Sequence, residues 1–553
     1  MASPSPEIRP NAEQSIEVDP SKVEETVEAI RSTSNASSEQ PPYSIFTLNE
    51  KRLIVVILTS AALFSPISST IYYPSLTTLA ADLHVSNTLI NLTITSFMIF
   101  QGLAPAFIGA FSDAEGRRPA YLICFTIYII ANIGLALQKN YAALFILRCV
   151  QSSGSSGTIA LANAVVSDIA MPSERGTWMG WANCGALLGL AFGPIIGGLL
   201  SQYLGWKSIF WFLAIFAGVT LKPLLLFFPE TCRAVVSNGS LRPAKWNRCL
   251  LDRRLSQRLA KPSTAPPSPP IPPHRLRFPN PLKTLALLFE QEASLLLVSS
   301  GFLFAGYYAL MAAFPSQLAA KYGYTPLKIG LCFIPCGAGG LLSALTTGRL
   351  MDANFRRHAH RQSIAPAAAR QQRRLAPGFP IEAARMEVAL PFVGVGAATM
   401  LAFGWLLHAR TGVAGVLVLV FFVGYATSGA FTVLSTLIVD LFPAKPATAT
   451  AAANITRCWL GAAATAVVVP MIARVGAGWT FTFVAALWVC LVPPLWAVVR
   501  WGPGMRAEKE RREREREGRA RAEDVEVGGD ELEVEKKMEA DVVGGEDEKV
   551  VVG

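Results

Sequence analysis

Hydrophobic residues in this chain gather into long stretches that are separated by short polar segments. Twelve stretches reach about 20 residues, the length that a helix needs to cross the hydrocarbon core of a bilayer. They lie near 52–74, 89–112, 119–137, 141–167, 178–203, 207–229, 291–315, 327–350, 388–409, 412–439, 447–474 and 479–500. The pattern therefore predicts an all-α membrane protein with twelve transmembrane helices in two six-helix bundles.

A polar segment divides the twelve stretches into two sets of six. It includes the Pro-rich run KPSTAPPSPPIPPH, which is typical of a linker. We therefore expect a disordered N-terminus over 1–50, a bundle over 51–229, a linker over 230–290, a second bundle over 291–500 and a charged tail over 501–553. Lys and Arg are concentrated in the linker and in the loop 352–388, so the positive-inside rule predicts that the linker and both termini are cytoplasmic.

Composition agrees with a membrane protein, because 52% of the residues are hydrophobic and only 16% are charged. The net charge of +10 does not indicate nucleic-acid binding, since the basic residues lie between the stretches, where topology explains them. The nine cysteines show no CxxC or Cys/His spacing, and the five histidines lie in loops or near the ends of stretches. We therefore predict no metal site, no cofactor and no enzyme active site.

The fifth stretch, NCGALLGLAFGPIIGG, is unusually rich in glycine. Its glycines recur every fourth residue at Gly185, Gly189, Gly193 and Gly197, so they share one helix face that a neighbouring backbone can approach closely. An ordinary packing surface of small residues is the alternative. With Pro194 and Gly198, however, the order resembles the GxxxGPxxGG signature of drug:proton antiporters in the major facilitator superfamily.

The loop GAFSDAEGRRP resembles the GxxxDxxGRR loop of the same superfamily, through Gly109, Asp113, Gly116, Arg117 and Arg118. The resemblance implies a gate: the Asp113 carboxylate can lie against a helix N-terminus of the opposite half when the cytoplasmic side is shut, because that end of a helix is positive. Arg117 is expected to pair with Asp168, at the end of the fourth stretch. The alternative is a plain cytoplasmic turn.

Two arginines fall inside apolar stretches, where a charge is costly unless it faces a cavity or a partner. Arg148 and Gln151, in LRCVQSSGSSG, resemble the RxxQ motif of the superfamily, although an arginine this near Tyr141 has the alternative of snorkelling to the surface. Arg457 lies roughly 16 Å deep along the eleventh stretch, in NITRCWLGA with Asn454. An anion-facing role for Arg457 is favoured over structural pairing.

The remaining predicted substrate contacts come from a weak internal repeat and from aromatic residues. A shift of 271 positions aligns Asn183 with Asn454 and Ala186 with Arg457. Tyr307 and Tyr308 are expected to offer aromatic surface. The predicted substrate site thus consists of Arg148, Gln151, Asn183, Tyr307, Tyr308, Asn454 and Arg457.

Further motifs narrow the resemblance to the fungal quinidine-resistance and citrate-exporting clade of twelve-span drug:proton antiporters. They include PETCR at 229–233, NGS at 238–240, FPIEAARM at 379–386 and RWGPG at 500–504, and the similarity covers roughly 41–505. Citrate-exporting members carry an arginine and a glutamine at the positions of Ala186 and Leu190. The resemblance therefore does not imply export of a tricarboxylate.

The resemblance implies a monomeric plasma-membrane exporter of a drug, toxin, secondary metabolite or organic acid that exchanges its substrate for protons. The acidic residues between Arg52 and Phe228 all lie at the ends of stretches or in the loops between them, so no proton site is evident. They are Asp82, Asp113, Glu115, Asp168 and Glu174. Two alternatives remain open: a citrate-like organic-acid exporter or facilitator without proton coupling, and a membrane sensor that does not transport.

Overall fold

The computed structural model describes residues 44–171, 174–239, 241, 243, 247–250, 290–361, 380–409, 411–442, 446–506, 508, 511 and 515. Regular secondary structure in this part of the chain is helical throughout. The predictions for the N-terminal segment before residue 44, for most of the linker and for most of the tail concern residues outside the described ones.

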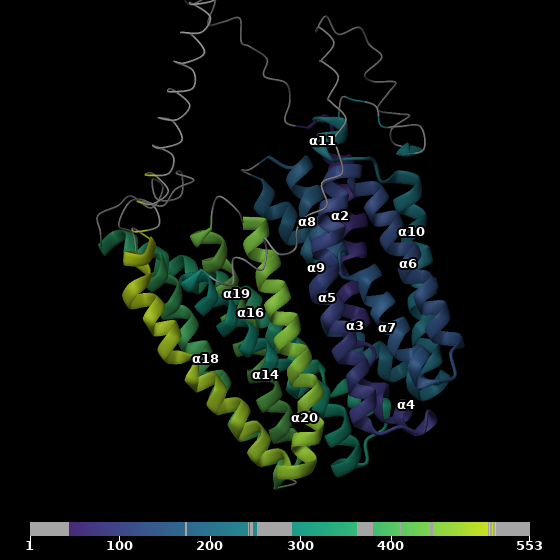
Figure 1. Ribbon diagram of the computed structural model, residues 1–553, viewed down its shortest axis with the longest axis vertical. Helices are drawn as coiled ribbons and strands as arrows, with labels where there is room; N and C mark the ends of the chain where they lie inside the picture. The colour runs from purple at the N-terminus through teal and green to yellow at the C-terminus, as the bar shows by residue number, and fades with distance from the viewer. Residues whose placement is uncertain are drawn as a thin grey trace, which may run out of the picture.

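Two helical bundles make up the molecule, one coloured purple to blue and the other teal to yellow in Figure 1. The first contains α2 (Leu48–Ala62), α3 (Phe64–Thr70), η1 (Tyr73–Ser75), α4 (Leu76–Asp82), α5 (Asn87–Glu115), α6 (Arg117–Leu137), α7 (Tyr141–Ser155), α8 (Thr158–Ile169), α9 (Arg175–Leu204), α10 (Lys207–Phe227) and the short α11 (Arg233–Val236). The second contains α14 (Gln291–Tyr322), α15 (Pro326–Leu331), α16 (Ile334–Arg361), α18 (Ile381–His408), α19 (Val413–Leu441) and α20 (Pro446–Cys490).

Ten helical segments in the described chain are long and apolar enough to cross a membrane. The predicted fourth stretch is divided into α7 and α8, which are each too short to be counted among the ten. The predicted eleventh and twelfth stretches are joined in α20, which breaks at Gly476, where φ is 83° and the backbone is not helical. The first span also begins earlier and ends later than predicted, because α2, α3, η1 and α4 continue one another from Leu48 to Asp82.

Polar residues just before two helices fix where these helices begin. Thr47 and Glu50 form a capping box at α2: the Thr47 N–H donates to Glu50 Oε2 at 2.8 Å, and the Glu50 N–H donates to Thr47 Oγ1 at 3.5 Å. Ser86 caps α5 by accepting from the Leu89 N–H at 3.3 Å. Each cap satisfies backbone donors that a helix N-terminus leaves without a partner.

The two bundles contact each other toward one end of the molecule. We call it the short-loop end, because it holds the loops after Leu204 and Tyr322; the opposite linker end holds Glu115, Glu230 and Arg361. Toward the short-loop end α5 packs along α20 and α9 packs along α15. There the Leu327 N–H donates to Gln202 Oε1 across the bundles at 3.1 Å.

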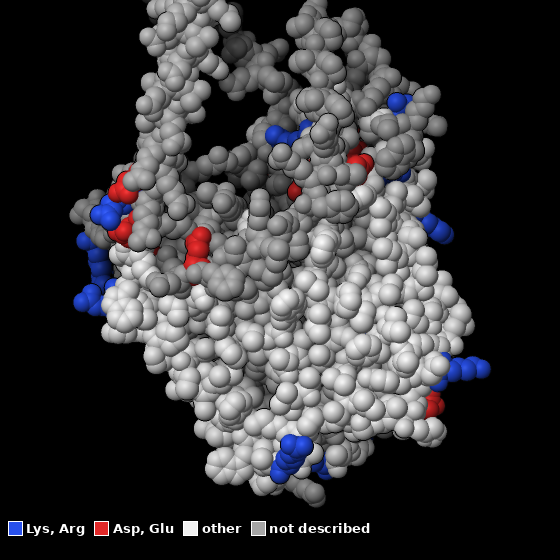
Figure 2. All heavy atoms as spheres, viewed as in Figure 1, with Lys and Arg blue, Asp and Glu red and all other residues white. Residues whose placement is uncertain are grey.

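Toward the linker end the side chains of α5 become exposed. Phe107 is 50% exposed, and the side chain of Asp113 is 68% exposed. On the face shown in Figure 2, charged side chains lie toward the two ends and the broad band between them is uncharged. The described conformation is therefore closed at the short-loop end.

Candidate functional site

Arg148 is held in the interior of the first bundle. It is 1% exposed, and its Nη1 donates to Gln151 Oε1 at 2.6 Å and to the Ser68 carbonyl at 3.3 Å. Its guanidinium lies 4.5 Å from the ring centroid of Tyr72 and 4.3 Å from that of Phe97. Arg148 does not snorkel to the surface, so that alternative is wrong.

Polar residues on neighbouring helices fix the Arg148–Gln151 pair. Gln151 Nε2 donates to Asn132 Oδ1 at 2.8 Å, and the hydroxyls of Ser68 and Tyr128 lie 2.6 Å apart. Sequence reasoning missed these three partners, although an isolated Asn in the apolar run IYIIANIGLAL was a signal that could have found one.

One edge of the Arg148 guanidinium makes no hydrogen bond within the described structure. Its Nε and Nη2 are buried and have no hydrogen-bond partner in the described part of the chain. These two N–H groups point the same way and match the two oxygens of a carboxylate. Arg148 thus has two donors available for an anion, although in this conformation they are covered.

Arg457 on α20 has similar surroundings in the second bundle. It lies 4.9 Å from the ring centroid of Phe304 and 5.2 Å from that of Phe431, and its Nη2 donates to Asn454 Oδ1 at 2.6 Å. Its Nε has no hydrogen-bond partner among the described residues. Arg457 is only half-buried, so it remains more accessible than Arg148.

Asn454 also makes polar contacts with α5 and with its own helix. Its Nδ2 donates to the Gln101 carbonyl of α5 at 3.2 Å, and its Oδ1 accepts from Cys458 Sγ at 3.8 Å. Close by, the hydroxyls of Thr95 and Thr465 lie 2.9 Å apart. We call these contacts between α5 and α20 the seam.

The remaining predicted substrate residues divide between two places. Tyr307 and Tyr308 lie edge to face at 5.7 Å, and Phe304 lies 5.8 Å from Tyr308, so both tyrosines belong to the aromatic surroundings of Arg457. Asn183 instead donates to Asn163 Oδ1 at 3.1 Å within the first bundle. The structure therefore brings Asn454, Arg457, Tyr307 and Tyr308 together, and Arg148 with Gln151, but it places Asn183 apart from these contacts.

The antiporter-like signature on α9 uses two faces of the helix. Gly185, Gly189, Gly193 and Gly197 face α2, α3 and the turn after α3, where a Cβ would come too close to Thr59, Leu63, Thr70 and Ile71, respectively. Pro194 and Gly198 instead face α15: a Cβ on Gly198 would lie 2.6 Å from the Pro326 carbonyl oxygen, and a Cβ on Gly330 would overlap the Pro194 carbonyl. The repeated glycines pack inside their own bundle, and Pro194 and Gly198 pack between bundles.

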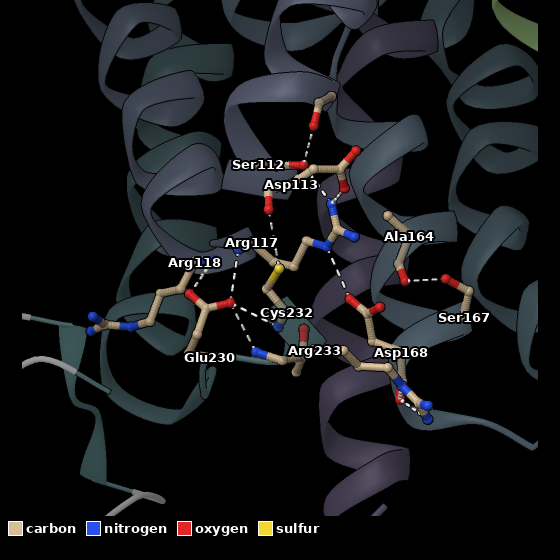
Figure 3. A network of polar contacts seen from close by, with 12 residues as sticks. Ser112, Asp113, Arg117, Arg118, Ala164, Ser167, Asp168, Glu230, Cys232 and Arg233 are labelled. Atoms are coloured by element: carbon tan, nitrogen blue, oxygen red, sulfur yellow. Dashed lines mark hydrogen bonds and ion pairs between the residues drawn. The ribbon is translucent and has the colours of Figure 1, made fainter. Parts of the chain in front are cut away.

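At the linker end, the predicted pairing of Arg117 with Asp168 is present. Arg117 Nε donates to Asp168 Oδ2 at 2.9 Å, and Arg117 also pairs with Asp113 (Figure 3). Arg233 donates to the Asp168 carbonyl oxygen from Nε at 3.1 Å and from Nη2 at 3.0 Å. Asp113 therefore bonds within its own bundle here, and it makes no contact with the described residues of the opposite half in this conformation.

Glu230 is a residue whose role sequence reasoning missed. Its carboxylate accepts from the N–H groups of Arg117 at 2.8 Å, Arg118 at 3.2 Å and Cys232 at 2.9 Å, so it caps the N-terminus of α6. Gly116 turns the chain into this cap with φ at 115°, and a Cβ there would overlap Glu230. The position of Glu230 in the PETCR motif was a signal, but the motif indicated only a helix stop.

We call Asp113, Arg117, Asp168, Glu230 and Arg233 the linker-end network; the side chains of the other predicted gate residues do not join it. Arg118 points away from it, donating from Nη2 to the Leu225 carbonyl at 2.9 Å, and Gly109 has open space around it. Burial raises the pKa of the Cys232 thiol, which donates to the Asp113 carbonyl at 3.7 Å.

The second bundle contains a counterpart of the network. Arg385, near the start of α18, pairs with Asp440 at 3.1 Å, as Arg117 at the start of α6 pairs with Asp168. Glu382, which is 0% exposed, pairs with Arg506 at 3.0 Å. Asp168 near the end of α8 and Asp440 near the end of α19 thus form matching ion pairs in the two bundles.

Comparison with known proteins identifies the family. Residues 58–465 match the Major Facilitator Superfamily. The chain belongs to this superfamily of membrane transporters. It is a multi-pass membrane protein that binds small molecules within the membrane, and it is not an enzyme.

Relatives and a solved structure agree with this assignment. The chain is 46% identical over 454 residues to the MFS-type transporter phiD of Fungal sp. (strain ATCC 74256), covering 82% of this chain and 69% of that protein. It is 35% identical over 511 residues to citrate exporter 1 of Aspergillus niger, covering 92% and 95% of the two chains. The structure of the xylose transporter XylE from E. coli matches 81% of this chain and 99% of that chain with a TM-score of 0.56 at 13% identity, which shows the fold alone.

Proposed function

We propose that this transporter exports a small organic molecule from the cytosol by alternating access. The proposal depends on two features of the structure taken together: each bundle holds an arginine in its interior, and in the described part of the chain the two bundles are closed against each other at one end only. Arg148 and Arg457 each present guanidinium donors without a hydrogen-bond partner in the described interior, while the bundles meet toward the short-loop end. A site between two bundles that rock about it is the arrangement that alternating access requires.

The proposal includes the finer placement suggested by the motifs. We place the chain in the twelve-span drug:proton antiporter family, as a monomer in the plasma membrane with both termini and the linker cytoplasmic and no nucleic-acid partner. The proposal keeps the division predicted from the sequence into an N-terminus, a first bundle, a linker, a second bundle and a charged tail. The division of α20 at Gly476 and the α7–α8 pair support twelve spans in place of ten.

The substrate contacts in this proposal are Arg148, Gln151, Tyr307, Tyr308 and Arg457. A guanidinium edged by aromatic rings suits a compound with an acidic group and an apolar body, because the rings contact the body while the donors bind the acid. Asn183 stays a prediction as a substrate contact, and Asn454 is treated separately below. Drugs, toxins, secondary metabolites and organic acids include such compounds.

Two candidate mechanisms remain for the coupling of substrate transport to protons. Proton antiport is what the motif resemblance predicts. An organic-acid exporter or facilitator without proton coupling is favoured by a specific observation: in the described helices the acidic residues lie within about three turns of a helix end, Asp352 being the furthest in, and none of them forms an ion pair with Arg148 or Arg457. The similarity to citrate exporter 1 supports the organic-acid candidate.

Vesicle transport tests the proposal. Proteoliposomes with the full chain are loaded with benzoate, decanoate, citrate or the cationic dye rhodamine 6G, and efflux is compared with that from protein-free vesicles. Faster efflux of any compound supports an exporter, whereas none with correctly folded protein would favour the sensor alternative. An imposed pH gradient at fixed membrane potential then separates the candidates, because only an antiporter links efflux to proton uptake.

A further inference from the structure

Asn454 links a cation in one bundle to the backbone of the other. Its Oδ1 accepts from Arg457 Nη2 at 2.6 Å, and its Nδ2 donates to the Gln101 carbonyl of α5 at 3.2 Å. Both bonds come from one planar amide, so the bond to Arg457 also orients the donor that reaches across the seam. Whatever removes the first bond leaves the second without its support.

Only one of the two hydrogen-bond donors on the side of the Arg457 guanidinium that faces Asn454 has a partner in the described structure. Nε and Nη2 form the side of a guanidinium that binds a carboxylate with two parallel hydrogen bonds. Asn454 supplies one oxygen, and Nε has no hydrogen-bond partner in the described structure. A carboxylate there fills both donors and adds an ionic attraction that a neutral amide lacks, so an arriving anion competes well with Asn454.

We propose that Asn454 couples substrate binding to opening of the seam: an organic anion that binds Arg457 displaces the Asn454 amide oxygen and thereby releases the Asn454–Gln101 hydrogen bond. The inference rests on the proposed function and gives its substrate class as a carboxylate or a similar acid. Since the described conformation is closed at the short-loop end, loosening the seam favours the opening at that end that export needs. Asn454 is accordingly a positioning residue and does not need to contact the substrate.

Another hydrogen bond of the same seam provides a matched control. The Thr95 and Thr465 hydroxyls lie 2.9 Å apart, and Thr465 is 0% exposed. This bond has no connection to the Arg457 edge, since its partners are each other and nearby carbonyls. Thr465→Val therefore weakens the seam without removing the proposed link.

A native cysteine reports on the seam without engineering. Cys458 is 0% exposed and packs against α5, where a Cβ on Gly102 would lie 3.1 Å from the Cys458 Cβ. The full chain in proteoliposomes is treated with N-ethylmaleimide, and peptide mass spectrometry measures alkylation at Cys458. Cys124, 2% exposed in the core of the first bundle, serves as the internal reference. The probes are benzoate, decanoate and citrate, with benzyl alcohol as the uncharged comparison.

In the wild type, at least one acid is expected to accelerate Cys458 alkylation relative to benzyl alcohol by about two- to tenfold, which corresponds to the loss of one hydrogen bond. Asn454→Ala and the isosteric Asn454→Asp, which places a permanent carboxylate beside Arg457, should be fast without acid and should not respond to it. Thr465→Val should be faster than wild type and should keep the response. The ratio with and without acid is compared within each variant, which removes any direct effect of residue 454 on the nearby thiol.

Either of two alkylation results would overturn the inference while leaving the proposed function intact. One is an acid that is transported in vesicles yet leaves Cys458 alkylation unchanged in the wild type; the other is an undiminished response in Asn454→Ala and Asn454→Asp. Transport of rhodamine 6G alone, with none of the acids transported, would also reject the proposal that the substrate is an organic anion. Absence of transport for every compound would instead reject the proposed function itself.

Discussion

Arg148 and Arg457 show how single residues hold positive charge away from water. Each guanidinium lies against two aromatic rings, and each has a carboxamide three positions away on its own helix, Gln151 and Asn454 respectively. Cation–π contacts and one strong hydrogen bond offset part of the desolvation cost. Neither arginine forms an ion pair within the described residues, so an anionic substrate would supply the missing charge.

The first prediction concerns the shape of the Arg457 side chain. Arg457→Lys keeps the charge but loses the planar fork, and Arg457→Gln loses both. If the transported acid binds here, its apparent affinity should fall in the order wild type, Lys, Gln, by about tenfold or more for Gln. Concentration-dependent efflux from vesicles measures this order. Disappearance of both variants from the membrane would instead indicate a structural arginine.

The second prediction concerns Glu230 as the cap of α6. Glu230→Gln keeps the size of the side chain but removes the charge that accepts from the N–H groups of Arg117 and Arg118, so it should destabilise the protein by about 1–3 kcal/mol. Thermal unfolding in detergent measures the loss. Glu115→Gln is the matched control, because Glu115 is nearby and its carboxylate has no ion pair in the described structure. This variant should unfold like wild type. Equal unfolding temperatures for both variants would contradict the capping role.

At the scale of elements, α9 is notable because it packs against helices of both bundles. Its repeated glycines pack against α2, α3 and the turn after α3, while Pro194 and Gly198 pack against α15 of the other bundle. Close approach on both sides requires small residues, because a side chain would separate the backbones. The helix is therefore tightly packed both against the first span and at the bundle interface.

The third prediction compares two glycines of α9. A Cβ on Gly197 would overlap the Ile71 carbonyl oxygen, which is backbone and cannot rotate away, whereas nothing lies within 4 Å of a Cβ on Gly180. Gly197→Ala should therefore lower thermal stability by roughly 1–3 kcal/mol and slow transport, and Gly180→Ala should change neither. Detergent unfolding and vesicle efflux measure both effects. A neutral Gly197→Ala would show that α9 packs less tightly than described.

At the scale of the whole molecule, the two ends differ. The seam and the α9–α15 contact close the short-loop end, while Asp113 at the linker end has no partner among the described residues of the other bundle and remains largely exposed. A carboxylate that contacts a helix N-terminus only when the linker end shuts would stabilise one state of the cycle and not the other. Its removal changes the balance between states without disturbing the fold.

The fourth prediction follows from that asymmetry. Asp113→Asn should slow transport by roughly two- to thirtyfold, the range expected for losing one interaction with a helix terminus, while membrane abundance stays near wild type. Initial efflux rates normalised to the amount of inserted protein measure the effect. Normal transport by correctly inserted Asp113→Asn would show that the loop serves topology alone.

The sequence by itself determined the helical membrane fold and the superfamily, because apolar length and short motifs are local properties of the chain. It also predicted the Arg117–Asp168 pair, since both residues lie at marked helix ends. It did not reveal that Glu230 caps α6 or that Asn454 reaches the Gln101 carbonyl, because both contacts join residues far apart in the chain. Only the tertiary structure decides which distant backbone atoms come within hydrogen-bond distance, and this depends on how the bundles pack and which end of the molecule is closed.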